Sequence, residues 1–189
     1  MRTQSQFRTS SGDPQQGFVL IVALILLLVL TLLGLAAAQS TSLEQKMAGN
    51  ARDQDMAFQA SEAGLSAARG CVLSATPACV AFNAVTTGGN GSYLFDVTNP
   101  TLWTQANFWT TAGNTLGYTA ITGTSLPSPV AAQPQFIIEE LPPVAAPGMN
   151  LGQSQFGGGT PSVSRYRVTS LGTGGSSTTT TMLQSVITQ

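Results

Sequence analysis

The feature that most constrains this chain is an uncharged apolar run near its start, GFVLIVALILLLVLTLLGLAAA at residues 17–38. No residue from Pro14 to Leu43 carries a charge. The stretch from Phe18 to Ala38 would form a helix about 30 Å long, which matches the hydrocarbon core of a bilayer. Lipid is the solvent that favours so much continuous apolar surface, so the run predicts a membrane-spanning helix.

Charged residues on the two sides of the run predict how it crosses the membrane. Arg2 and Arg8 precede the run, and Asp13 is the only acidic residue before it. Glu44 and Lys46 follow it. Positive charge is retained on the cytoplasmic side. We therefore expect the N-terminus in the cytoplasm and the rest of the chain outside it.

Beyond the run, about 150 residues remain, which is enough for one modest core. The net charge of −1 gives no reason to expect nucleic-acid or anionic-membrane binding. Cys71 and Cys79 have Pro77 between them and could form a disulfide outside the cytoplasm. Two free, partly buried thiols are the alternative, and we favour the disulfide.

Apolar residues continue at helical spacing beyond the run. This stripe predicts one long helix of about 50 residues that continues through Gly49 and Gly64 to near Gly70. Gly70 followed by Pro77 provides the signals that end a helix. The stripe, with spacings of three, four or seven, consists of Leu43, Met47, Ala51, Phe58, Leu65, Ala68 and Val72.

Three segments toward the C-terminus have the composition of β-strands: 135–141, which stops at the Pro142-Pro143 pair, then 164–171 and 178–188. The glycine-rich stretch 172–177 supplies a hairpin turn between the last two. The predicted fold class is α+β, with a long N-terminal helix packed on a small antiparallel sheet. The loop-rich segment before these strands carries aromatic residues that we interpret as core: Trp103, Phe108, Trp109 and Tyr118.

The N-terminal layout resembles that of a type IV pilin precursor. A polar leader is followed by Gly17-Phe18, by the apolar run and by an amphipathic helix. The segment LEQKMAGNARDQDMAFQASEAGL is more specific and resembles PilX-type minor pilins. FIIEELPPV and RYRVTSLGTGGSSTTTTMLQSVI, toward the C-terminus, are similar to the same family. The resemblance covers residues 16–69 and 136–187.

The resemblance implies a pilin-like fold and assembly of a type IV pilus. A prepilin peptidase would cut after Gly17 and methylate the new terminal amine of Phe18. The mature subunit would remain in the bacterial inner membrane, with its C-terminal domain in the periplasm, and then enter the fibre. Other minor pilins, the major pilin and a tip adhesin would be its partners. The chain would comprise a leader (1–17), a transmembrane half-helix (18–38), an amphipathic half-helix (39–70) and a globular region (71–189).

Val22 departs from the pattern of that family. Many pilins carry a glutamate five residues into the mature chain, where it is expected to attract the terminal amine of a neighbouring subunit. A subunit with Val22 cannot neutralise that amine. Two interpretations stay open. The subunit lies at or near the fibre tip, where no subunit lies ahead of it, or the position has drifted to an apolar residue.

Three alternatives to a pilin remain at this point. Ala36 and Ala38 fit a signal-peptide cleavage pattern, which would release a soluble chain beginning at Gln39. A membrane-anchored or secreted binding domain would also carry an apolar run. A type II secretion pseudopilin would share the whole N-terminal layout.

The sequence gives little support for an enzyme. The chain has no histidine, which excludes Ser-His and Cys-His nucleophile pairs. Glu139 and Glu140 are adjacent on a predicted strand and point to opposite faces. Asp53 and Asp55 do not face each other on a helix, so we interpret them as a solvated face. We expect no catalytic residue, no metal site, no cofactor and no nucleic-acid site.

Overall fold

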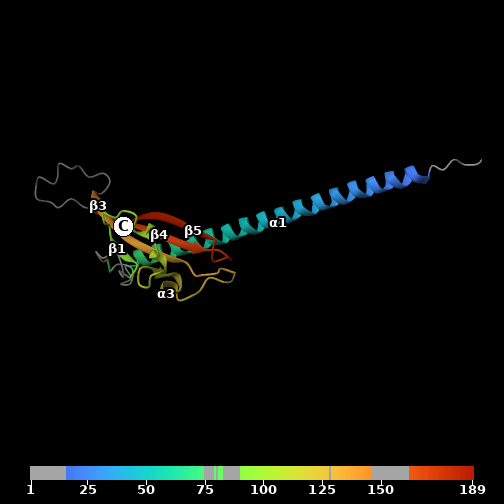
Figure 1. The fold of residues 1–189 in the computed structure, drawn as a ribbon. Coiled ribbons are helices and arrows are strands. Elements are labelled where there is room, and N and C mark those ends of the chain that lie inside the picture. The colour runs from blue at the N-terminus through green and yellow to red at the C-terminus, as the bar shows by residue number, and fades with distance from the viewer. Residues whose placement is uncertain (1–15, 75–78, 80, 83–89, 128, 146–161) are drawn as a thin grey trace, which may run out of the picture. The chain divides into compact units, whose positions relative to one another are not determined.

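The computed structural model describes residues 16–74, 79, 81–82, 90–127, 129–145 and 162–189. The chain divides into two compact units, Met1–Ala48 and Gly49–Gln189. The elements, in chain order, are α1 (Gln16–Leu73), β1 (Ser92–Leu94), η1 (Leu102–Thr104), η2 (Phe108–Thr110), β2 (Leu116–Gly117), α3 (Tyr118–Thr122), β3 (Gln135–Ala145), β4 (Ser162–Thr173) and β5 (Thr180–Thr188) (Figure 1).

Helix α1 is continuous over 58 residues. The prediction of one long helix is therefore confirmed, and the helix passes through Gly34, Gly49 and Gly64 without a break. No proline occurs between Gln16 and Leu73, so every interior N–H can donate to the carbonyl four residues earlier.

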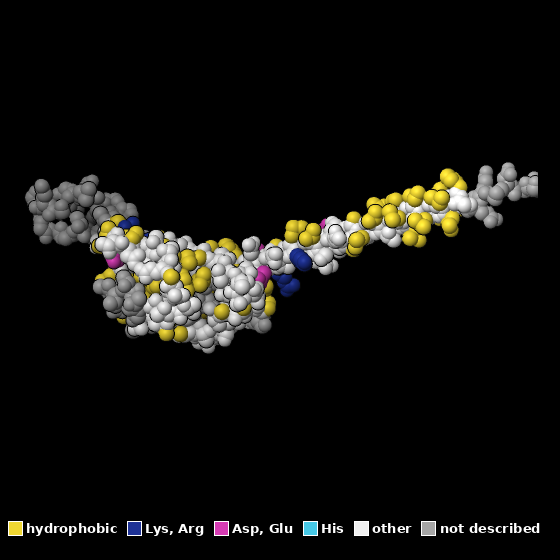
Figure 2. Space-filling model, viewed as in Figure 1, with side chains coloured by type: hydrophobic (Ala, Val, Ile, Leu, Met, Phe, Trp, Pro, Cys, Tyr) yellow, Lys and Arg dark blue, Asp and Glu magenta, His cyan; other side chains and the backbone are white. Residues whose placement is uncertain are grey.

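Within the first unit, α1 is apolar on every side from Gly17 to Ala38. All residues from 17 to 48 are exposed, including Phe18 (73%) and Leu30 (66%). Figure 2 shows hydrophobic side chains along the visible side of this N-terminal part of the helix. A helix that is apolar all round requires lipid or other helices as its surroundings, because water disfavours so much apolar surface.

The second unit contains a small sheet in the order β1-β3-β4-β5, and β2 also pairs with β3. The β2–β3, β3–β4 and β4–β5 pairs are antiparallel, while β1 pairs with β3 in parallel. The predicted α+β class is confirmed, but the sheet is mixed rather than purely antiparallel. The long connection from β1 to β3 allows the parallel pairing, which a tight turn could not.

The three segments predicted as strands lie in β3, β4 and β5. The predicted stop at Pro142-Pro143 is wrong, since β3 continues to Ala145. The β3–β4 register shifts between Leu141 and Val144. Proline has no N–H to donate to the ladder, so the two prolines are accommodated by this irregularity instead of ending the strand.

Helix α1 packs against one face of the sheet through small side chains. Ala57, Ser61 and Ala68 are each 0% exposed. A Cβ atom at Gly172 of β4 would overlap the carbonyl oxygen of Ala57 and the amide nitrogen of Ser61, so glycine permits the close approach. The same face contributes Phe136, Ile138 and Val168 to the core beside α1.

The apolar stripe predicted for α1 only partly faces the sheet. Ala68 and Val72 are buried and Leu65 is half-buried. The other members of the stripe are exposed: Leu43 (59%), Met47 (62%), Phe58 (44%) and Ala51. Large side chains would hold the helix backbone away from the sheet, so the small-residue side makes the contact and the bulky stripe lies to its flank.

The opposite face of the sheet is covered by the segment between β1 and β3. Tyr93, Leu102 and Phe108 pack with Ile137 of β3, and Trp103 and Trp109 pack partly buried against them. Of the aromatic residues predicted as core, Phe108 is therefore buried, and Trp103, Trp109 and Tyr118 are half-buried.

Candidate functional site

The residues predicted for processing and assembly lie together at the start of α1. The helix begins at Gln16, so Gly17 and Phe18 lie in its first turn. Val22 follows Phe18 by four residues and therefore lies on the same side of the helix. Phe18 is 73% exposed and Val22 is 37% exposed. Residues 17–30 are all apolar, so this end of the helix offers a neighbouring subunit only apolar side chains and backbone.

Small residues in the same part of α1 leave room for a close neighbour. A Cβ atom at Gly34 would meet nothing within 4 Å. Ala36, Ala37 and Ala38 follow on the next turn and are exposed. Small side chains allow helix backbones to approach each other in lipid, where van der Waals packing drives association.

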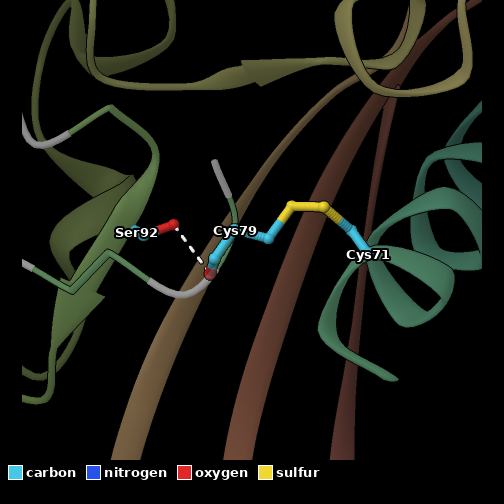
Figure 3. Close-up of a disulfide and its surroundings, with 3 residues drawn as sticks. All are labelled: Cys71, Cys79 and Ser92. Carbon is cyan, nitrogen blue, oxygen red and sulfur yellow. Dashed lines mark hydrogen bonds between the residues drawn. A yellow bond between two sulfur atoms is a disulfide. The ribbon is translucent and has the colours of Figure 1, made fainter. Parts of the chain in front are cut away.

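The C-terminal end of α1 is tied to the sheet by a disulfide between Cys71 and Cys79 (Figure 3). The two Cα atoms are 5.9 Å apart, and both residues are buried, at 3% and 0% exposure. The Ser92 hydroxyl at the start of β1 donates to the Cys79 carbonyl at 3.0 Å. This disulfide and hydrogen bond connect the end of the helix to the edge strand β1.

Asp53 of α1 holds the turn between β4 and β5. Its carboxylate accepts a hydrogen bond from the Ser176 amide at 3.0 Å. A hydrogen bond from the Thr179 side chain is the main cause that lowers the pKa of Asp53, with smaller contributions from the Ser176 and Gly175 amides. Asp53 is half-buried, so interpreting it as part of a solvated face is wrong, whereas Asp55 is exposed.

A buried ion pair lies on the sheet face opposite α1. Arg167 of β4 donates from Nε and Nη2 to the two carboxylate oxygens of Glu139 at 2.8 and 2.9 Å. Nη2 also donates to the Pro100 carbonyl at 2.8 Å. The Arg167 guanidinium carbon is 4.4 Å from the ring centroid of Trp103 and 5.2 Å from that of Phe95. The arginine therefore joins two strands to the loop that covers them.

This arrangement is structural in character. The side chain of Glu139 is 2% exposed and that of Arg167 is 15% exposed, so neither offers an accessible acid or base. Glu140, on the opposite face, takes no part. The pairing of these two residues is not evident from the sequence. Only 8% of the residues are charged, so an acid and a base at the centres of two predicted strands were the one indication that they could pair.

Two family models match this chain. The model described as PilX N-terminal matches residues 16–66, and the model described as type IV pilus assembly protein PilX C-term matches residues 47–189. The chain belongs to the PilX family of type IV pilus assembly proteins. The matches overlap on residues 47–66 of α1, so they join the apolar helix and the sheet unit in one family. Neither a search of curated proteins nor one of solved structures found a match.

Membership of the PilX family confirms the resemblance noted in the sequence. A PilX protein acts with other components of the pilus, and the family is one of assembly proteins rather than enzymes. Of the helices that the structure describes, α1 is the one that is long and apolar enough to cross a membrane, judged by length and composition. These properties fit a membrane-associated protein of pilus assembly.

Proposed function

We propose that this PilX protein is a minor pilin that helps to initiate the fibre and remains at or near its tip. The observation that carries the proposal is the first part of α1. Residues 17–43 of this helix are uncharged and exposed on every side. Such a helix is stable in lipid, and it can leave lipid only for an equally apolar bundle of helices. A pilus core built from pilin helices provides that bundle.

The proposal includes a precursor that a prepilin peptidase cleaves after Gly17. The cut removes Arg2, Arg8 and the rest of the polar leader, which would otherwise keep the N-terminus in the cytoplasm. The mature chain then begins at Phe18, whose terminal amine the same enzyme methylates. The second unit would lie in the periplasm, where disulfides such as Cys71–Cys79 persist.

The tip position is proposed from Val22. A terminal amine buried among apolar helices costs several kcal/mol when it has no counter-charge. This subunit has no acid at Val22 to supply that charge to a subunit lying ahead of it. At the tip there is no subunit ahead, so the valine leaves no terminal amine without a counter-charge. The other minor pilins, the major pilin and a tip adhesin are the partners that this position implies.

Processing is tested with two substitutions at one position. We expect Gly17→Arg to block cleavage, so that the protein stays at precursor size in the membrane and is missing from sheared fibres. Gly17→Ala is the matched control, which we expect the peptidase to accept. A Gly17→Arg protein that still ran at mature size would refute the processing step.

Tip placement is tested with Val22→Glu. We expect little change in the number of pili per cell, because a tip subunit meets no amine ahead of it. Gold labelling of the protein along the fibre should remain confined to one end. Labelling along the shaft in cells that carry the unchanged protein would count against the tip position, since it would show that a subunit with Val22 can lie behind other subunits.

A further inference from the structure

Strand β5 is a regular, uncharged edge of the sheet. It pairs with β4 and with no other strand that the structure describes. Its register with β4 runs from Thr180 to Thr188 without a shift. Residues 178–189 contain neither a charged residue nor a proline. Natural edge strands are usually interrupted by charge, proline or a bulge, which prevents pairing with another chain. β5 lacks these protections.

The register shows which backbone groups of β5 point away from β4. Ser164 and Gln189 exchange both of their backbone hydrogen bonds, at 3.0 Å each. Bonded and non-bonded pairs alternate along an antiparallel ladder, so the odd-numbered residues of β5 bond to β4. The outward N–H and C=O groups belong to Thr180, Met182, Gln184, Val186 and Thr188.

A series of hollows between α1 and β5 lies along this edge. Phe58 and Asp55 line a hollow of about 470 Å³ with Thr180 at the start of β5. Further along, Arg69 lines two hollows of about 230 and 240 Å³ with Ser185 near the end of β5. Earlier residues of α1 lie beside earlier residues of β5, and later residues beside later ones, so the helix and the strand run in the same direction. We call the row of these separate hollows along β5 the groove; the nine residues of β5 beside it span about 26 Å of extended chain.

Apolar side chains are exposed on both sides of the edge. On the helix side, Phe58 is 44% and Leu73 is 49% exposed. On the other face of the sheet, Met182 is 41% and Val186 is 54% exposed. Successive side chains of a strand point to opposite faces, so one strand added to β5 would cover both sets. A partner that docked on the helix alone would leave Met182 and Val186 exposed.

We propose that β5 accepts an extended strand from a different subunit of the pilus, paired antiparallel to it in the groove. The charges on the α1 wall indicate the chemistry of that strand. Asp55 is exposed and lines the hollow at the start of β5, and Arg69 is exposed and lines the two hollows near its end. The incoming strand therefore begins with an acidic residue near Arg69, alternates apolar or β-branched residues through its centre, and ends with a basic residue near Asp55.

A second copy of this chain fits the edge less well. Two β5 strands paired antiparallel about a two-fold axis would direct their α1 helices in opposite directions. Subunits of one fibre, all inserted from one membrane, have parallel helices. The β5 sequence also carries no charge to complement Asp55 and Arg69 of a partner. The inference rests on the role in pilus assembly and is independent of cleavage after Gly17.

Hydrogen exchange tests the strand pairing directly. The full chain is compared in detergent micelles, alone and as the complex co-purified with the other minor pilins of the same cells, with individual amides followed by NMR. We expect the outward amides, such as Met182 and Val186, to exchange fast in the isolated chain and at least about tenfold more slowly in the complex. Leu183 and Ile187, which bond to β4, should be slow in both. Outward amides that exchange equally fast in both samples would overturn the proposal.

Val186→Lys tests the edge by substitution. Lysine on an edge strand disfavours pairing with another chain, so recovery of the complex should fall at least about tenfold. The matched control is Leu94→Lys, which places the same charge on the opposite edge strand, β1, at a residue that is 44% exposed. An unchanged tryptophan unfolding curve verifies that each variant is folded. Equal recovery of the two lysine variants would overturn the proposal.

The identity of the added strand is tested by cross-linking. A thiol introduced by Met182→Cys is labelled with a benzophenone maleimide, and Val97→Cys, at a residue 78% exposed outside the groove, is the control. In assembled fibres, Met182→Cys should cross-link to a predominantly uncharged extended segment of another pilus subunit. A cross-link to a second copy of this chain, or the same products from both positions, would overturn the assignment. Processing remains separately testable, because these measurements do not depend on where the mature chain begins.

Discussion

Replacing Arg167 with methionine should destabilise the sheet unit more than any other single change to a charged residue that the structure describes. Methionine keeps much of the length and apolar volume of the arginine but removes its charge and its donors. Glu139, with its side chain 2% exposed, would then be a buried carboxylate without its partner. Breaking a buried pair by removing one member costs about 3–5 kcal/mol. The loss of the Pro100 hydrogen bond and of the stacking on Trp103 is included in that figure.

The assay is urea unfolding of the full chain in detergent micelles, followed by tryptophan fluorescence. The chain has two tryptophans, Trp103 and Trp109, and both pack around this region. Their emission therefore reports on the sheet unit and not on the apolar half of α1. With a slope of about 2 kcal/mol per molar urea, a loss of about 4 kcal/mol lowers the midpoint by about 2 M.

The matched control is Arg165→Met, two residues away on the same strand. Arg165 donates to the Pro142 carbonyl at 3.2 Å and pairs with no carboxylate in the part of the chain that the structure describes. We expect Arg165→Met to lower the free energy of unfolding by about 1 kcal/mol or less. The double variant Glu139→Gln, Arg167→Met should recover part of the loss, because it leaves no buried charge. If Arg167→Met shifted the midpoint no further than Arg165→Met, the reasoning about the buried pair would be refuted.

Three further predictions concern the contacts of α1 in the second unit. Gly172→Ala should lower the free energy of unfolding by about 1–3 kcal/mol, because the added Cβ would overlap the backbone of α1. Gly70→Ala is the control: a Cβ there meets nothing within 4 Å, so this change should be neutral or stabilising. The pKa of Asp53 is lowered on folding from the ordinary aspartate value of 3.8, so its stabilising contribution is present above pH 3.8 and is lost as pH falls through the folded pKa; the acid sensitivity of the urea midpoint should diminish in Asp53→Asn. Reduction of the Cys71–Cys79 disulfide should cost about 2–3 kcal/mol, and an unchanged midpoint in dithiothreitol would contradict a bonded pair.

The sequence was sufficient to predict the helix and the fold class. An uncharged run followed by apolar residues at helical spacing, with no proline between Pro14 and Pro77, predicts one long helix, and α1 is that helix. β-Branched residues on both sides of a glycine-rich turn identified the segments of β4 and β5. These signals are local, since each is determined by residues within one element.

The contacts between elements were not predictable in the same way. The stripe that contains Phe58 showed which side of α1 is apolar, but not whether the sheet or another molecule covers that side. Glycine, alanine and serine give only a weak hydrophobic signal, so the close contact of Ala57 and Ser61 with Gly172 could not be predicted. The Glu139–Arg167 pair was missed because it depends on strand register, which joins residues distant in sequence.

The central claim is that the apolar helix enters a fibre after the polar leader has been removed. The most direct test is the intact mass of this protein, recovered from sheared surface fibres. We predict the mass of residues 18–189 with one methyl group on the amine of Phe18 and with the two cysteines oxidised. A mass that includes Met1, or one for a chain beginning at Gln39, would contradict the account.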